Sequence, residues 1–215
     1  EVRRRLVFTQ WHELNEAVES GRGVLIVTMH FGVWDLGAGA LAAHDYPINV
    51  IVDTFRDAKL DRLVHSSREK LGMKVIPRER VGIGVFRALR RGEILAMLID
   101  VPPEDQVVTV DFFGRPAQFS AAPARIALRT GAWVVPAMVL RGPEEDQLIR
   151  PIIDVRSVRY EPTGDEEHDV HALTQQIAGA LEAALRRHPE QWYLFHPLWA
   201  HGDASVTRAL LTSER

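Results

Sequence analysis

Apolar residues along this chain alternate between short unbroken runs and runs spaced by three or four positions, a pattern typical of buried strands and amphipathic helices. The pattern predicts strands at 24–28, 48–52, 73–76, 94–99, 107–113, 133–140 and 148–155, and helices at 9–20, 33–43, 57–71, 85–91, 120–130 and 169–187. Because strands and helices alternate, we expect a single α/β domain with a mostly parallel central sheet and helices on both faces. The last two strands are joined by the short polar turn 141–147, so this pair can run antiparallel.

Two of the predicted helices carry clear apolar stripes. In helix 57–71 the residues expected on the inner side are Leu60, Leu63, Val64 and Leu71, and Gly72 ends the helix. In helix 169–187 the apolar residues recur every four positions, at Leu173, Ile177, Leu181 and Leu185. Both stripes are therefore expected to face the core.

Composition narrows the class of protein. The 215 residues are 46% hydrophobic, which supports one large domain at 1–200 followed by a polar tail at 201–215. There are no cysteines, so thiolate catalysis, disulfides and cysteine-bound zinc are excluded. No run approaches the roughly 18 apolar residues of a spanning helix, and no signal peptide is visible.

Charge is distributed unevenly along the chain. The formal net charge of −3 argues against nucleic-acid binding, but segment 51–92 contains eleven Lys and Arg against five Asp and Glu. Such a segment suits an anionic ligand or a membrane surface, and it equally suits solvated helix faces. Charge alone leaves both interpretations open.

The segment from His30 to Asp35 joins the first long strand to the next helix. On one continuous helix the two side chains would point about 140° apart, at roughly 3.6 residues per turn. If the chain turns at Gly32, however, His30 lies before the helix and Asp35 in its first turn, and both can face one site at the carboxyl edge of the sheet. A His with a carboxylate partner is a common general base. The alternatives are a surface His beside a capping Asp, or a metal pair, for which no third ligand is evident.

Three more polar residues are candidates for the same site. Asp100 ends the fourth strand and is followed by Val101 and two prolines, which fits a turn residue or a site residue equally well. Arg62 and Arg68 lie six positions apart on helix 57–71 and so face different directions, one toward a carboxylate or phosphate and the other toward solvent. Arginine suits bidentate recognition of such groups better than lysine does.

Aromatic residues gather at two places. Phe112-Phe113-Gly114 is either a strand end with core aromatics or a wall for an alkyl chain, with Gly114 allowing close backbone approach. The cluster near the carboxyl terminus comprises Trp192, Tyr193, Phe195 and Trp199. Core packing is the expected role of this cluster, and contact with a membrane interface is the alternative.

Taken together, these segments resemble the bacterial lipid A biosynthesis and lysophospholipid acyltransferase superfamily of the His-x4-Asp/Glu type, over about residues 21–199. The pieces that carry the resemblance are Gly-Arg-Gly-Val-Leu-Ile-Val-Thr at 21–28, His30-Phe-Gly-Val-Trp-Asp35, Arg68 ahead of Leu71-Gly72, Asp100 closing an apolar strand, Phe112-Phe113-Gly114, Thr-Gly-Ala within 127–136, and Pro-Glu-Gln-Trp-Tyr-Leu-Phe-His-Pro-Leu-Trp at 189–199. No single piece is decisive, but their order and spacing together are specific. The Asp at position 35 and the Trp-rich end look more like the phosphatidylinositol mannoside acyltransferases than the lipid A enzymes, which usually carry Glu in the motif and end in a basic stretch.

The resemblance implies a glycerolphosphate/lysophospholipid acyltransferase-like fold and a role in lipid biosynthesis. It implies transfer of a fatty acyl group from acyl-CoA or acyl carrier protein to a glycolipid hydroxyl, peripherally at the inner face of the bacterial cytoplasmic membrane, with no metal or other cofactor. It also implies His30 as base, Asp35 as its partner, and Arg68 with Asp100 as a second pair of site residues. Family members usually have more chain before the first strand, which here begins at residue 24, so anchoring of this chain is in doubt.

The resulting hypothesis is that His30 deprotonates the acceptor hydroxyl and Asp35 fixes the His30 tautomer. Backbone N–H groups near Gly32 or Val33 are the expected oxyanion donors, with Arg68 as a further candidate. An apolar groove for the acyl chain is expected from Phe31, Trp34, Phe112 and Phe113. The alternatives are a lysophospholipid or lipid A precursor as acceptor, a thioester hydrolase, and a non-catalytic lipid-binding protein.

Overall fold

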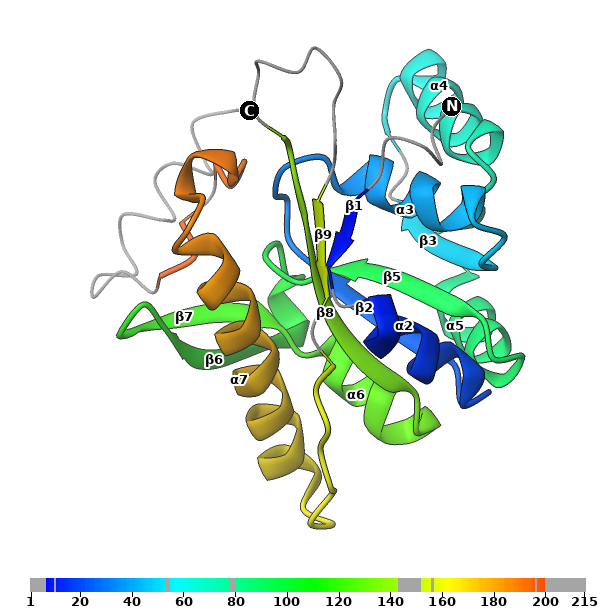
Figure 1. The fold of residues 1–215 in the computed structure, drawn as a ribbon. Coiled ribbons are helices and arrows are strands. Elements are labelled where there is room, and N and C mark those ends of the chain that lie inside the picture. The colour runs from blue at the N-terminus through cyan, green and yellow to red at the C-terminus, as the bar shows by residue number, and fades with distance from the viewer. Residues whose placement is uncertain are drawn as a thin grey trace.

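A seven-stranded sheet runs through the middle of the molecule (Figure 1), in the order β1-β9-β8-β2-β5-β3-β4. The computed structural model describes residues 7–9, 11–52, 55–77, 80–142, 152–155, 157–195 and 197–199. The strands are β1 (Val7–Thr9), β2 (Val24–Thr28), β3 (Ile48–Val52), β4 (Lys74–Pro77), β5 (Ile94–Leu98), β8 (Trp133–Leu140) and β9 (Ile152–Val155). All neighbouring pairs are parallel except β8 and β9, which are antiparallel. The expected single α/β domain with a mostly parallel sheet is confirmed.

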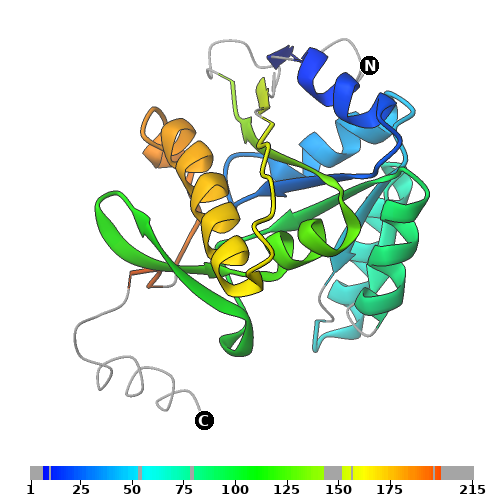
Figure 2. The same cartoon turned by 90° about the horizontal axis from the view of Figure 1, so that it is seen from below.

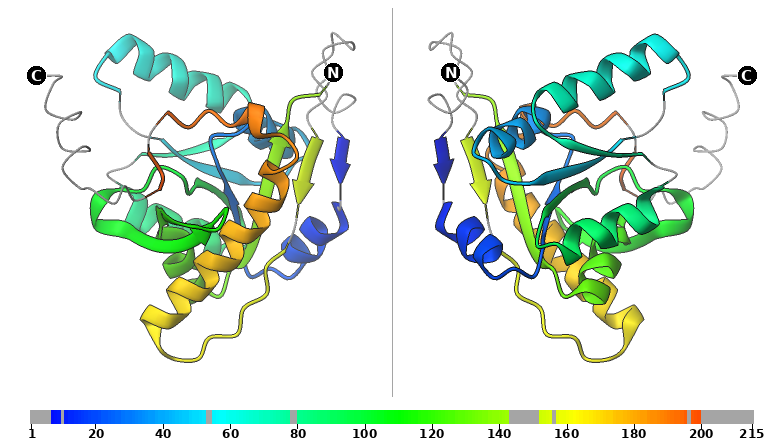
Figure 3. Two further views of the ribbon diagram at one scale, coloured as in Figure 1. Left: turned by 90° about the vertical axis from the view of Figure 1, so that its left-hand side faces the viewer. Right: turned by 90° about the vertical axis from the view of Figure 1, so that its right-hand side faces the viewer.

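Helices cover both faces of this sheet (Figures 2 and 3). They are α2 (Trp11–Glu19), α3 (Trp34–Ala43), α4 (Ala58–Lys70), α5 (Val81–Arg90), α6 (Ala122–Thr130) and α7 (Glu166–Leu185). Residues of α2 and α3 share one core cluster, whereas α5, α6 and α7 share the other with the hairpin β6 (Val107–Phe112)–β7 (Arg115–Ser120). Alternation along β2 explains the division, since Leu25 and Val27 face one cluster and Val24 and Ile26 the other.

The apolar pattern predicted most elements closely and missed two strands. The strands at 24–28, 48–52 and 133–140 have the predicted bounds, and α7 buries the four predicted residues of its stripe. The missed strands are β1 and β7. The pattern placed no strand between the predicted strand 107–113 and the predicted helix 120–130, but Phe113 and Gly114 close a two-residue hairpin loop, both at positive φ, so the next strand already begins at Arg115. The part of the predicted strand 148–155 before residue 152, and the polar tail 201–215, lie outside the described residues.

The apolar side chains of helix α4 are more exposed than the sequence pattern predicts. Leu60, Leu63 and Leu71 were expected on its inner side, yet they are 45%, 62% and 39% exposed, and no residue of α4 is buried. Val64 alone of the predicted four packs against the core, and it is only partly buried. None of the described helices is long and apolar enough to cross a bilayer.

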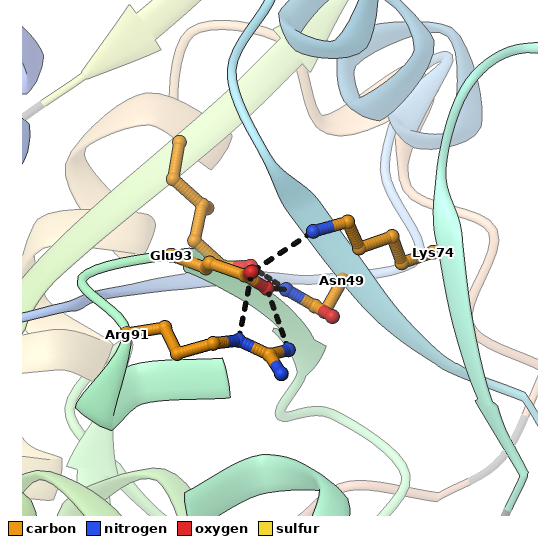
Figure 4. A network of polar contacts seen from close by, with 5 residues as sticks. Asn49, Lys74, Arg91 and Glu93 are labelled. Atoms are coloured by element: carbon orange, nitrogen blue, oxygen red, sulfur yellow. Dashed lines mark hydrogen bonds and ion pairs between the residues drawn. The ribbon is translucent and has the colours of Figure 1, made fainter. Parts of the chain in front are cut away.

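Glu93, directly before β5, forms hydrogen bonds that link β5 to β3 and β4 near their amino ends (Figure 4). This buried carboxylate accepts hydrogen bonds from Asn49 Nδ2 of β3, Lys74 Nζ of β4, and Arg91 Nε, at 2.9 Å each. Burial raises the pKa of Glu93, but the hydrogen bonds from Asn49, Lys74 and Arg91 outweigh that effect and hold the pKa below its ordinary value. The network stabilises the half of the sheet that carries β5.

A second buried carboxylate, Asp169, organises the loop before α7. It accepts hydrogen bonds from Tyr160 Oη, from the backbone N–H and the hydroxyl of Thr163, and from the Gly164 N–H. Burial raises the pKa of Asp169, but the hydrogen bonds from Thr163, Tyr160 and Gly164 prevail and lower it to about 2.

Candidate active site

His30 and Asp100 meet at the carboxyl ends of two adjacent strands. His30 follows β2 and Asp100 follows β5, and these strands pair in parallel from Val24 opposite Ile94 onward. The Nδ1 atom of His30 lies 2.9 Å from Asp100 Oδ1, and the backbone N–H of His30 donates to Asp100 Oδ2 at 3.0 Å. The Asp100 side chain is fully buried, whereas that of His30 is 34% exposed. The pair therefore has a buried carboxylate and an accessible imidazole.

The hydrogen bonds around Asp100 fix which nitrogen of His30 carries its proton. Asp100 Oδ2 accepts from two groups that can only donate, the His30 N–H and Trp192 Nε1 at 3.1 Å. An ionised carboxylate accepts and does not donate, so Nδ1 must donate to Oδ1. The Nε2 atom of a neutral His30 then carries a lone pair, which is the arrangement of a general base.

Asp35 has a different partner from the one expected. It accepts two hydrogen bonds from Arg68, from Nε at 3.0 Å and from Nη2 at 3.1 Å. The expectation that Asp35 orients His30 is therefore wrong in this structure, because Asp100 holds His30 and Asp35 is bonded to Arg68. The pair ties the first turn of α3 to the last turn of α4. Arg62 is exposed on α4, so one arginine meets a carboxylate and the other meets solvent, as their spacing predicts.

A cavity of about 380 Å³, lined mainly by apolar residues, opens beside His30. The other residues that line it are Ile51, Ala96, Met97, Leu98, Val101, Tyr193, Leu194 and Phe195. A neighbouring cavity of about 730 Å³ shares four of these residues and extends to Arg125 and Arg129 of α6. Both volumes fall in the range of roughly 300–1,000 Å³ that is typical of small-molecule sites.

The aromatic residues expected to line an acyl groove have other positions. Phe31 and Phe112 are fully buried in the core, so neither can line an open groove, and that expectation is wrong for both. Phe112 lies 6.1 Å from the Trp192 ring, centroid to centroid, and so packs behind the residue that holds Asp100. Phe113 and Gly114 form the tip of the β6–β7 hairpin and do not line the cavity beside His30. Of the four aromatic residues expected to line the groove, Trp34 is the one whose ring contacts the His30 ring, edge to face at 5.4 Å between centroids.

The backbone around Gly32 is already hydrogen-bonded. The Gly32 N–H donates to Gln191 O at 2.8 Å, and the Val33 N–H donates to Val139 O at 2.9 Å. The expectation that these groups bind an oxyanion is therefore wrong in this structure. Gly32 has a steric role instead, since its φ is +55° and an added Cβ would lie 1.9 Å from Val139 O.

Several site residues escaped the sequence-based prediction. Trp192 was expected to pack in the core or at an interface, yet its indole N–H holds Asp100. Ile51 and Met97 lie at the carboxyl ends of predicted strands, and that position is the signal that would have found them. Phe195 was expected to pack in the core with its aromatic cluster, yet it is 88% exposed and lines the cavity beside His30. Among the described residues, no group of three or more His, Asp or Glu side chains is arranged to hold a metal ion.

Similarity to known proteins extends over most of this chain. The family model for bacterial lipid A biosynthesis acyltransferases matches residues 1–201. A phosphatidylinositol mannoside acyltransferase of Mycobacterium tuberculosis (strain CDC 1551 / Oshkosh) is 26% identical over 205 residues, which is 93% of this chain and 62% of the relative. An enzyme of the same name from Mycolicibacterium smegmatis is 27% identical over 200 residues, 91% of this chain and 62% of its own length. This chain thus spans under two thirds of these relatives, and it belongs to the bacterial lipid A biosynthesis acyltransferase family.

Proposed function

We propose that this protein transfers a fatty acyl group from an acyl thioester, acyl-CoA or acyl carrier protein, to a hydroxyl of a glycolipid that resembles a phosphatidylinositol mannoside. The acceptor class is suggested by the names of the relatives, which are about one quarter identical to this chain. We place the reaction at the inner face of the bacterial cytoplasmic membrane, where such a lipid acceptor would reside. The thioester is the only co-substrate that the chemistry requires.

The observation that carries the proposal is the hydrogen bond from His30 Nδ1 to the buried Asp100. It leaves a lone pair on Nε2 of an accessible imidazole, and His30 lines a cavity whose other residues are mainly apolar. A lipid hydroxyl has a pKa far above 7, so it needs a base as it attacks. A positioned base of this kind typically contributes about 10²–10⁴ in rate.

The reaction proceeds without a protein nucleophile. The acceptor oxygen attacks the thioester carbonyl carbon while its proton passes to His30 Nε2. Asp100 stabilises the imidazolium that forms, as the carboxylate of a serine-type triad does. Collapse of the tetrahedral intermediate breaks the C–S bond, and His30 returns the proton to the leaving sulfur.

The residues around His30 suit both the acyl chain of the donor and the phosphate groups of its carrier. The apolar walls formed by Ile51, Met97 and Val101 match an alkyl chain. Arg125 and Arg129 line the adjoining cavity and match phosphate groups of the donor's carrier, with Arg129 paired to Glu166 in the absence of such a group. No side chain caps the start of α3, and the Leu36 N–H already donates to Val33 O, so we assign the oxyanion to the N–H groups of Trp34 and Asp35.

Transfer of labelled palmitate from palmitoyl-CoA to a panel of glycolipid acceptors, with products identified by mass, tests this proposal. We expect an acylated glycolipid, and we expect His30→Ala to lose at least about 10²-fold in turnover while melting like the wild type. Near-wild-type turnover of the folded variant would eliminate His30 as the base. Free palmitate at the same rate with and without acceptor would instead identify a hydrolase. Lipid binding without turnover on any acceptor would identify a lipid-binding protein.

A further inference from the structure

Exposed apolar side chains are concentrated around the candidate active site. Nine large apolar residues are exposed among those the structure describes: Leu36, Phe55, Leu60, Leu63, Leu71, Ile83, Val101, Tyr193 and Phe195. Six of them come in the first half of a segment that follows the carboxyl end of β2, β3, β4 or β5: Leu36, Phe55, Leu60, Leu63, Ile83 and Val101. Tyr193 and Phe195 line the cavity beside His30, and Leu71 does neither. Single exposed apolar residues need no explanation, but their collection on one edge of a domain marks an interaction surface.

Helix α4 supplies the most projecting part of this surface. It lies at the outer edge of the molecule in both views of Figure 3. Leu60 and Leu63, in its first two turns, share a side at helical spacing and are 45% and 62% exposed. The sequence pattern correctly identifies an apolar stripe here, but much of that stripe points to solvent, where it has no partner among the described residues.

The cations of the same turns also point to solvent. Arg56, Lys59 and Arg62 flank the two leucines and are exposed, and no carboxylate of the described residues forms an ion pair with them. An apolar stripe flanked by cations is the composition of helices that lie in the interface of an anionic bilayer.

The acidic residues of these turns are engaged in local hydrogen bonds. Asp57 caps the helix by accepting from the N–H groups of Lys59 and Leu60, and these bonds lower its pKa. Asp61 accepts from the Phe55 N–H at 2.9 Å. The three cations exceed these two carboxylates by one charge, so this part of α4 carries a net charge of +1.

We propose that this edge, led by Leu60 and Leu63 of α4 together with Phe55 and Phe195, docks on the surface of an anionic lipid bilayer. The leucines and phenylalanines enter the interface while Lys59 and its neighbours meet lipid phosphates. The cavity beside His30 then faces the bilayer, so an acceptor presents its hydroxyl without leaving the membrane. The inference rests on the proposed function in requiring a lipid acceptor.

Co-sedimentation with vesicles of phosphatidylcholine, with and without phosphatidylglycerol, tests the docking surface. We expect Leu60→Ser/Leu63→Ser to lower partitioning into the anionic vesicles at least about tenfold, because two leucines leave the interface. Leu71→Ser is the matched control, since it makes the same change at the opposite end of the same helix and is expected to bind within about twofold of the wild type. Arg56→Gln/Lys59→Gln should weaken binding only where phosphatidylglycerol is present.

The variants test the proposed catalysis and the proposed docking surface independently. His30→Ala should bind vesicles like the wild type even though it no longer transfers acyl groups. If Leu60→Ser/Leu63→Ser binds vesicles fully and melts normally, the docking surface is wrong while the proposed function stands. If the wild type binds vesicles through these leucines but acylates no acceptor, docking stands and the function fails. A dimer in light scattering that dissociates in the double variant, with no vesicle binding by the wild type, would mean that a second copy covers α4 and would overturn the proposal.

Discussion

Replacement of Asp100 by asparagine is the most direct test of the active-site geometry. In the wild type, Oδ2 accepts from the His30 N–H and from Trp192 Nε1, and Oδ1 accepts from His30 Nδ1. The amide oxygen of the substituted side chain will remain on the two fixed donors, which turns its NH₂ group toward Nδ1. Nδ1 must then accept, so the proton moves to Nε2 and the base loses its lone pair.

The expected loss follows from this change of tautomer. Removal of general-base catalysis costs about 10²–10⁴ in rate, which corresponds to roughly 3–5 kcal/mol of transition-state stabilisation. We expect kcat of Asp100→Asn to fall within that range. The fold should survive because the asparagine is nearly isosteric and keeps two of the three hydrogen bonds. Acyl transfer at saturating acceptor measures kcat, and a thermal melt checks the fold.

Asp35→Asn is the matched comparison, because it makes the same chemical change five residues from His30. Asp35 is bonded to Arg68 and its side chain is 46% exposed. We therefore expect its effect on turnover to be coupled to Arg68, so that Asp35→Asn/Arg68→Gln costs no more than the worse single variant. An Asp100→Asn enzyme with nearly normal kcat, beside an Asp35→Asn enzyme that loses about 10² or more, would refute our assignment and make Asp35 the working partner of His30.

Three further predictions concern the framework. Gly32→Ala should lower the free energy of unfolding in urea by more than about 2 kcal/mol, because the new methyl group meets Val139 O, whereas Gly114→Ala, also at positive φ but with open space around it, should cost only about 1–2 kcal/mol. Glu93→Gln should cost about 1–3 kcal/mol in the same measurement, because Asn49 and Lys74 then lose the charged acceptor of their hydrogen bonds. Asp169 titrates at about 2 when folded and near 3.9 when unfolded, so its stabilisation is complete above about pH 4 and is lost as pH falls toward 2. Melting temperatures of Asp169→Asn should therefore depend less on pH between these values than those of the wild type, and an unchanged slope would contradict this assignment.

The sequence by itself determined the elements and the edge at which the chemistry gathers. Unbroken apolar runs defined β2 and β5, and a parallel sheet places the residues that follow them, His30 and Asp100, at one edge. The elements that it missed are short or interrupted. β7 contains Pro116, and the hairpin loop before it needs positive φ at Phe113, a non-glycine residue.

Only the tertiary structure decided which carboxylate reaches His30. Asp35 is close in sequence, but Asp100 is bonded to His30 Nδ1 because β5 returns to lie beside β2, and a pattern of alternating elements does not encode strand order. Likewise, an apolar stripe shows that a helix has an apolar side, and only packing shows whether the sheet covers it. For α7 the sheet and the hairpin cover that side, whereas Leu60 and Leu63 of α4 remain exposed.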